Sequence, residues 1–202
     1  DSYKFVKTGN SIFRSVVSLD STFNMVLSAV LIVGLPILIT EVLKMSDTLY
    51  GFSQSALSLG GLCGGFLTAL VAEKLRLKNL YLLLLTCSAS VFLMSVSLLI
   101  GLPPIISYGV ITAMSFIAMG ASTLFVVQIY TMVQQQTPTQ LVGKIMATLI
   151  AVAMCGQPIG QLFYGILFDI FNANTWVVLM IASIASILIS WYSKKIFAKL
   201  EK

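Results

Sequence analysis

The sequence predicts an all-α membrane protein with six transmembrane helices. Charged residues make up only 9% of its 202 residues and hydrophobic residues make up 58%, whereas soluble domains carry about 25% charged residues. Six apolar runs have the length of about 20 residues that a helix needs to cross a hydrocarbon core about 30 Å thick. So few charges cannot cover a water-facing surface, which excludes a soluble globular enzyme, a disordered chain and a fibrous repeat.

Short polar, glycine- or proline-containing stretches separate the six predicted spans. Asp20 is the one acid inside any of them, and none contains Lys, Arg or Glu. Residues 1–14 are predicted to be a cytoplasmic linker and residues 193–202 a basic cytoplasmic tail. Because residue 1 is Asp rather than Met, we expect the chain to continue a longer precursor. The predicted spans are Ser15–Thr40, Tyr50–Ala72, Leu80–Ile100, Ile105–Met132, Ile145–Phe168 and Trp176–Tyr192.

The basic residues predict the orientation of the spans. Eleven of the twelve Lys and Arg residues fall on one side of the predicted membrane, and only Lys44 falls on the other. Basic loops stay in the cytoplasm, so both termini are expected there, in the plasma membrane. This placement explains the net charge of +5 without a nucleic-acid partner. The eleven are Lys4, Lys7, Arg14, Lys74, Arg76, Lys78, Lys144, Lys194, Lys195, Lys199 and Lys202.

The composition argues against enzyme chemistry. The chain contains no histidine, which removes histidine general bases and histidine metal ligands. Cys63, Cys87 and Cys155 lie in apolar stretches without CxxC spacing, so we expect all three to be buried small hydrophobes rather than metal ligands. We therefore predict no catalytic residue, no metal site and no cofactor.

Polar side chains are concentrated in the first, second, fourth and fifth spans. Amides and acids are costly in lipid, so these side chains must face protein or water. One interpretation is a polar substrate cavity lined by these four helices, with the third and sixth spans as lipid-facing supports. The other is hydrogen bonding that joins the helices of the bundle. The candidate cavity residues are Asp20, Asn24, Ser28, Gln54, Ser58, Ser115, Ser122, Gln157 and Gln161.

Asp20 lies about a turn and a half from the predicted cytoplasmic end of its span. A position so near the end fits a solvated acid, or one paired with Arg14 across the helix end. An acid deeper in the membrane would be a candidate proton-coupling site. Two interpretations of Asp20 therefore stay open: a solvated or Arg14-paired acid, and a proton-coupling site.

Small residues predict close helix contacts. Gly60 and Gly64 are four residues apart, as small-xxx-small contacts require, and so are Gly61 and Gly65. In the fifth span Pro158 removes a backbone donor, and we expect it to kink the helix near mid-membrane.

The run from Val133 to Met146, VQQQTPTQLVGKIM, resembles the cytoplasmic loop between helices ten and eleven of major facilitator superfamily transporters. It is most similar to the drug-efflux branch that includes macrolide and enterobactin exporters. Lys144 stands where that loop usually has Arg. The loop from Glu73 to Lys78 resembles the family's basic loop between helices eight and nine, with Glu73 for the usual Asp and without the usual Gly. The cytoplasmic gate residues that this implies are Glu73, Lys74, Arg76, Lys78, Pro138, Gly143 and Lys144.

The resemblance implies the second half of a twelve-helix transporter, built as two inverted three-helix repeats. In that family helices seven, eight, ten and eleven line the cavity, which corresponds to the four spans with polar side chains. The implied function is proton-coupled export of amphiphilic small molecules by alternating access. The implied partners are membrane lipid, the substrate, protons, and a six-helix N-terminal half from the same precursor or a second copy. The alternative is a truncated or isolated membrane domain that does not transport.

Overall fold

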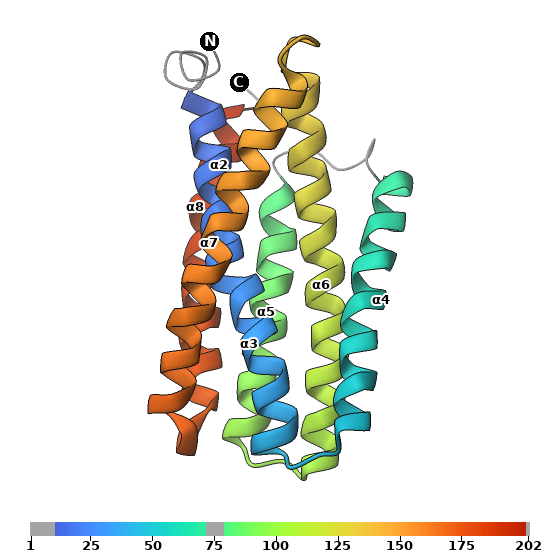
Figure 1. Cartoon of the computed structure of the whole chain (residues 1–202), viewed down its shortest axis with the longest axis vertical. Helices are drawn as coiled ribbons and strands as arrows, with labels where there is room; N and C mark the ends of the chain where they lie inside the picture. Colours follow the sequence, from blue (N-terminus) through green and yellow to red (C-terminus); the bar gives the residue numbers. More distant parts are fainter. Residues whose placement is uncertain (1–10, 72–78, 201–202) are drawn as a thin grey trace.

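The structure, a computed structural model, describes residues 11–71 and 79–200 (Figure 1). Over these residues it is helical with no strand. Six helices are long and apolar enough to cross a membrane, which confirms the predicted all-α membrane fold. Their ends lie within five residues of the predicted ones. These spans are Val17–Val42, Asp47–Val71, Leu80–Leu99, Pro104–Gln135, Val142–Ile170 and Trp176–Phe197.

The first span is a continuous but irregular helical rod. It consists of α2 (Ser11–Phe23), the π-helical turn η1 (Asn24–Ser28), α3 (Ala29–Pro36) and a second π-helical turn η2 (Ile37–Val42). Pro36 has no N–H to donate to the preceding turn, and the wider η2 turn follows it directly. π-Helical turns inside α-helices are rare and often occur at functional sites.

The other spans are regular. They are α4 (Asp47–Val71), α5 (Leu80–Leu99), α6 (Pro104–Gln135), α7 (Val142–Ile170) and α8 (Trp176–Leu200), with the short 3-10 helix η4 (Asn172–Asn174) before α8. After α5 the chain turns at Gly101, whose φ of +67° favours glycine. The helix of α7 continues through Pro158 without interruption, and the two π-helical turns lie in the first span.

The two segments predicted to lie outside the bundle are partly helical. Helix α2 begins at Ser11, inside the predicted linker, and α8 continues to Leu200, through most of the predicted tail. Lysine is a good helix former, so a spanning helix can extend past its apolar part without a break.

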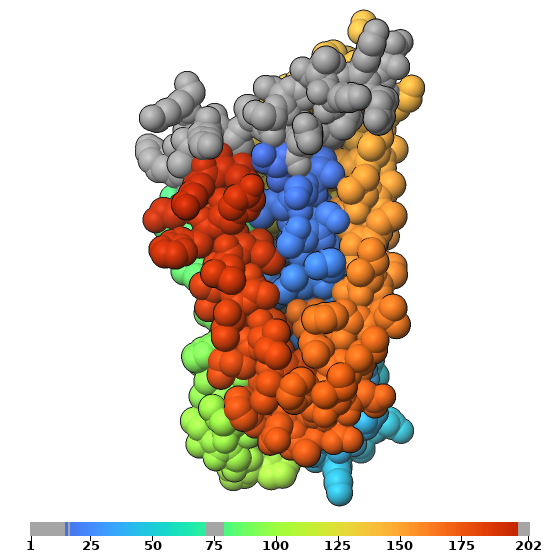
Figure 2. All heavy atoms as spheres, turned by 90° about the vertical axis from the view of Figure 1, so that its left-hand side faces the viewer, coloured from blue at the N-terminus to red at the C-terminus, as the bar shows by residue number. Residues whose placement is uncertain are grey.

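The helices pack in three main sets. Helix α4 packs along α6, α7 packs along the first span, and α5 packs along both α8 and α6. The first turn of α2 and the last turn of α8 lie at the same end of the bundle (Figure 1). This is expected of a chain that crosses a membrane an even number of times. Seen from the side, α2 lies between α7 and α8 (Figure 2).

Glycines bring α4 and α6 into close contact. A Cβ added at Gly60 would overlap the carbonyl oxygen of Phe116, and one at Gly64 would overlap that of Gly120. The two backbones therefore touch at two points four residues apart, as predicted for the glycine pair Gly60 and Gly64. A Cβ at the neighbouring Gly61 would make only ordinary side-chain contacts.

A second set of glycines joins α7 to the first span in the same manner. A Cβ at Gly156 would lie 2.6 Å from the carbonyl oxygen of Ser21. One at Gly160 would overlap the carbonyl oxygen of Met25 and lie 2.7 Å from the Cβ of Ala29. Only glycine allows the two helices to lie this close.

Serine hydroxyls join α5 to α8. The hydroxyl of Ser95 donates to the carbonyl oxygen of Trp176 at 2.8 Å, and that of Ser190 donates to the carbonyl oxygen of Tyr81 at 2.9 Å. These serines therefore serve as interhelical hydrogen-bond donors.

Candidate functional site

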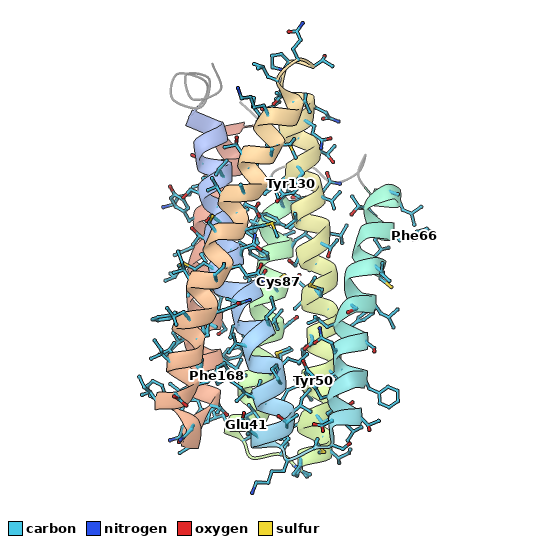
Figure 3. The ribbon with its side chains drawn as sticks, in the orientation of Figure 1. Glu41, Tyr50, Phe66, Cys87, Tyr130 and Phe168 are labelled. Carbon is cyan, nitrogen blue, oxygen red and sulfur yellow. The ribbon has the colours of Figure 1, made fainter. Side chains whose placement is uncertain are left out.

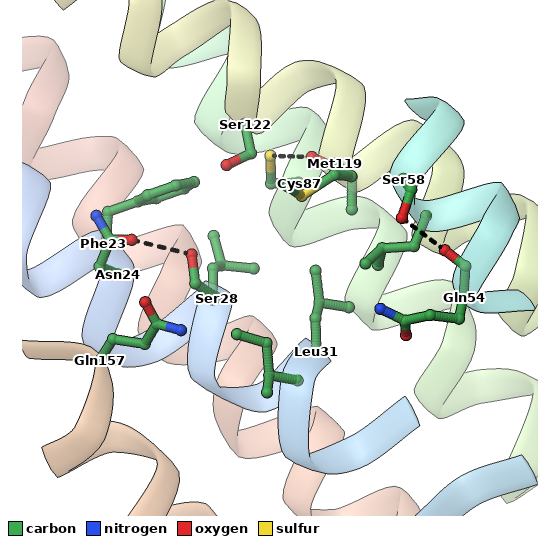
Figure 4. A pocket seen from close by; sticks show the side chains of 14 residues that line it. Phe23, Asn24, Ser28, Leu31, Gln54, Ser58, Cys87, Met119, Ser122 and Gln157 are labelled. Atoms are coloured by element: carbon green, nitrogen blue, oxygen red, sulfur yellow. Dashed lines mark hydrogen bonds between the residues drawn. The ribbon is translucent and has the colours of Figure 1, made fainter. Parts of the chain in front are cut away.

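A cavity of about 420 Å³ lies among the first span and helices α4, α5, α6 and α7 (Figure 4). Cys87, one of its lining residues, lies near the middle of the bundle's length (Figure 3). The lining is mostly apolar and carries no charged side chain. It consists of Phe23, Asn24, Leu27, Ser28, Leu31, Ile32, Gln54, Leu57, Ser58, Cys87, Ala118, Met119, Ser122 and Gln157.

The structure brings most of the predicted cavity residues together around this space. They come from the first span, α4, α6 and α7, and they are Asn24, Ser28, Gln54, Ser58, Ser122 and Gln157. Three predicted residues do not line it. Asp20 and Ser115 are fully buried, and Gln161 lies one turn further along α7 than Gln157. The hydroxyl of Ser115 has no hydrogen-bond partner among the described residues.

The polar groups of the lining differ in how they are bonded. The hydroxyl of Ser28 donates to the Oδ1 atom of Asn24 at 3.2 Å, and that of Ser58 donates to the backbone oxygen of Gln54 at 3.0 Å. The side-chain amides of Gln54 and Gln157 stand on opposite sides of the cavity (Figure 4). Within the described part of the chain neither amide is hydrogen bonded, so both are available to a ligand.

Sequence reasoning missed most of the apolar lining because it selected positions by polarity. It also missed Cys87, which comes from the third span and donates its thiol to the carbonyl oxygen of Ala118 at 3.3 Å. Only Cys87 agrees with the expectation that the cysteines are buried, since Cys63 and Cys155 are exposed. That expectation was wrong for these two because they lie on uncovered faces of α4 and α7.

Asp20 lies just beyond the cavity wall. Its side chain is 0% exposed, so the expectation of a solvated acid is wrong. The hydroxyl of Tyr130 donates to its Oδ2 atom at 3.2 Å, and Nδ2 of Asn24 donates to Oδ1 at 3.3 Å. The side chain of Arg14, its other predicted partner, lies outside the described residues. Helices α7, α8 and α6 pack against α2, and the position of Asp20 along its own helix did not indicate these contacts.

The predicted gate residues fall into two groups. Glu73, Lys74, Arg76 and Lys78 lie outside the described residues. Pro138 lies in the connection between α6 and α7, and its carbonyl oxygen accepts a hydrogen bond from the amide of Leu141 at 2.8 Å.

Gly143 and Lys144 lie in the first turn of α7. Among the described residues a Cβ at Gly143 would meet nothing within 4 Å, so no described segment of the chain approaches that glycine closely. Lys144 is exposed.

Within residues 11–71 and 79–200 no group of three or more His, Cys, Asp or Glu is placed to hold a metal ion. Comparisons with protein-family models, with curated proteins and with solved structures find no match to the chain.

Proposed function

We propose that the chain is one half of a secondary active transporter that exports amphiphilic small molecules by alternating access, driven by protons. The observation that carries this proposal is the cavity near the middle of a six-helix membrane bundle, with amides and hydroxyls from four helices turned into it. Transporter binding sites lie near the bilayer midplane between helices of this kind.

The chemistry of the lining supports the substrate class. Aromatic, aliphatic and thioether side chains fit an apolar body, and two free amides fit a small number of polar groups on it. Because no charged side chain lines the cavity, the several localised charges of sugar phosphates and nucleotides would enter without a counter-charge, and these highly charged compounds are disfavoured.

Equivalent contacts in the two halves of the chain support an inverted repeat of three helices each. The serine donors Ser95 and Ser190 are 95 residues apart, and so are their acceptors Tyr81 and Trp176. If each residue of the first three spans is replaced by its equivalent 95 positions later, and each residue of the last three by its equivalent 95 positions earlier, the Ser95–Trp176 hydrogen bond becomes the Ser190–Tyr81 hydrogen bond. An inverted-topology repeat predicts such an exchange.

The close glycine contacts of the two halves are equivalent in the same way. The carbonyl partners on the first span lie 95 residues before those on α6, and the glycines of α4 lie 96 residues before those of α7. The corresponding pairs are Ser21 with Phe116, Met25 with Gly120, Gly60 with Gly156, and Gly64 with Gly160.

Uncovered apolar faces support a second six-helix unit as partner. The most apolar stretch of α4 is only 17% buried, and those of α6 and α7 are each 28% buried, against 44% for the first span. These helices also line the cavity, whose opposite wall a second half would supply. We propose a plasma-membrane location with both termini cytoplasmic, because the basic residues fall on that side.

Binding of an amphiphilic probe to the purified chain in detergent tests the proposal, with ethidium as a probe that carries amino donors. Replacing Gln157 by leucine removes a free amide from the cavity wall, so we expect ethidium binding to weaken by about two- to tenfold, the value of a hydrogen bond. Gln161→Leu is the matched control, one turn away and outside the lining, and should leave the Kd unchanged. A chain that binds no ethidium, or equal losses in both variants, would count against the cavity as a substrate site.

A further inference from the structure

A hydrogen-bond chain runs from the cavity to a buried acid. The hydroxyl of Ser28 donates to Oδ1 of Asn24, Nδ2 of Asn24 donates to Oδ1 of Asp20, and the hydroxyl of Tyr130 donates to Oδ2 of Asp20. Ser28 and Asn24 line the cavity, whereas Asp20 is 0% exposed. The two cavity residues are the first and last residues of the π-helical turn η1.

No described basic group balances the charge of this acid. Of the elements packed against α2, α6 turns Tyr130 towards Asp20. The described cations of α7 and α8 are exposed: Lys144, Lys194 and Lys195. Among the side chains that the structure describes, no Lys or Arg nitrogen lies within 4.0 Å of the Asp20 carboxylate.

Among the described residues, the ionised form of Asp20 is stabilised by two side-chain donors. A buried carboxylate without a cation is costly unless hydrogen bonds stabilise it. Tyr130 supplies one donor from α6 and Asn24 supplies the other from the cavity wall. Nδ2 of Asn24 also donates to the backbone oxygen of Asp20, at 3.0 Å. A change that strengthens its bond to Oδ1 favours the ionised carboxyl over the protonated one.

We propose that Asp20 binds the coupling proton in this half, and that Ser28 and Asn24 link its proton occupancy to the substrate in the cavity. The inference rests on the proposed transport function. It adds a proton site, a route from that site to the substrate, and a requirement that the substrate donate a hydrogen bond.

The sign of the linkage follows from the direction of the donors. A substrate that donates a hydrogen bond to the Ser28 oxygen polarises its hydroxyl, which strengthens the bond to Asn24 and in turn the bond from Asn24 to Asp20. Stronger donation favours the carboxylate, so substrate binding breaks the carboxyl O–H bond and releases the proton. Linkage is reciprocal, so a proton on Asp20 weakens substrate binding, as proton–substrate exchange requires.

Tyr130 provides the path by which the proton leaves. Its hydroxyl contacts Asp20, and its side chain is half-buried rather than enclosed. The carboxyl proton passes to the phenol oxygen as the phenol proton passes to water, so the tyrosine ends unchanged and the carboxylate keeps the electron pair.

Proton release on ligand binding tests this linkage. The purified chain in weakly buffered detergent at neutral pH is mixed with ethidium, and a pH-indicator dye reports the protons released while ethidium fluorescence reports binding. We expect ethidium to bind with proton release. Tetraphenylphosphonium carries the same positive charge but no hydrogen-bond donor, so it should bind with less proton release, because only its charge then favours the carboxylate.

Three variants locate the proton. Asp20→Asn should bind ethidium and release none. Ser28→Ala keeps the acid but cuts the chain, and should bind ethidium with reduced release. Asp169→Asn removes an exposed carboxyl near the other end of the bundle and should behave as the original chain. Ethidium binding without proton release, or release that persists in Asp20→Asn, would overturn the proton site and leave the proposed function standing. Failure of the original chain to bind ethidium would instead overturn the proposed function, and the linkage with it.

Discussion

Replacing Gly160 by alanine is expected to destabilise the bundle strongly. The new Cβ would overlap the carbonyl oxygen of Met25 and lie 2.7 Å from the Cβ of Ala29. Neither neighbour is the end of a flexible side chain, so α7 and the first span must separate. Overpacking of this kind costs about 1–3 kcal/mol, occasionally more, and here it also opens the wall next to the cavity. Thermal unfolding in detergent, followed by circular dichroism, measures the change as a lower melting temperature.

Gly165→Ala is the matched control for this prediction. Gly165 lies on the same helix, and a Cβ there would meet nothing within 4 Å. Because alanine is the better helix former, the melting temperature should stay the same or rise. Equal losses in the two variants would show that the effect comes from the helix itself and would contradict the close contact.

Replacing Gly60 by alanine is expected to have an effect of similar size on the other helix pair. The new Cβ would overlap the backbone of Phe116 in α6, at the position equivalent to the Gly156 contact of α7 under the proposed repeat. The adjacent Gly61→Ala is the control, since its Cβ would lie 3.5 Å from the Met119 side chain, an ordinary contact. The two glycine contacts involve different helix pairs, so the losses in a Gly60→Ala, Gly160→Ala double variant should add. A stable Gly60→Ala chain would count against equivalent contacts in the two halves.

The helices of the fold could be predicted because membrane crossing places a strong length and composition requirement on each of them. Every predicted span is present, and the differences are confined to their ends. The ends moved because helices continue beyond the end of the apolar run, as α8 does beyond Tyr192. The π-helical turns of the first span could not be predicted, since only Pro36 marks one of them in the sequence.

The candidate site was predictable in part for a related reason. Polarity selects residues that must avoid lipid, and it selected Asn24, Gln54 and Gln157, which do line the cavity. Polarity does not fix the rotation of a helix, so it also selected Gln161, one turn away on α7, which does not. The burial of Asp20 depends on helices packed against α2 that are far away in the sequence, and position along one helix does not report such contacts.

Transport driven by an imposed proton gradient tests the central claim most directly. Inside-out membrane vesicles from cells that produce the protein are made acidic inside, and the accumulation of ethidium is followed by its fluorescence. A proton-driven exporter should accumulate ethidium until the gradient is collapsed, and Gln157→Leu should slow the accumulation while Gln161→Leu does not. Accumulation no greater than in vesicles without the protein would contradict the assignment as an exporter and favour a membrane domain that does not transport.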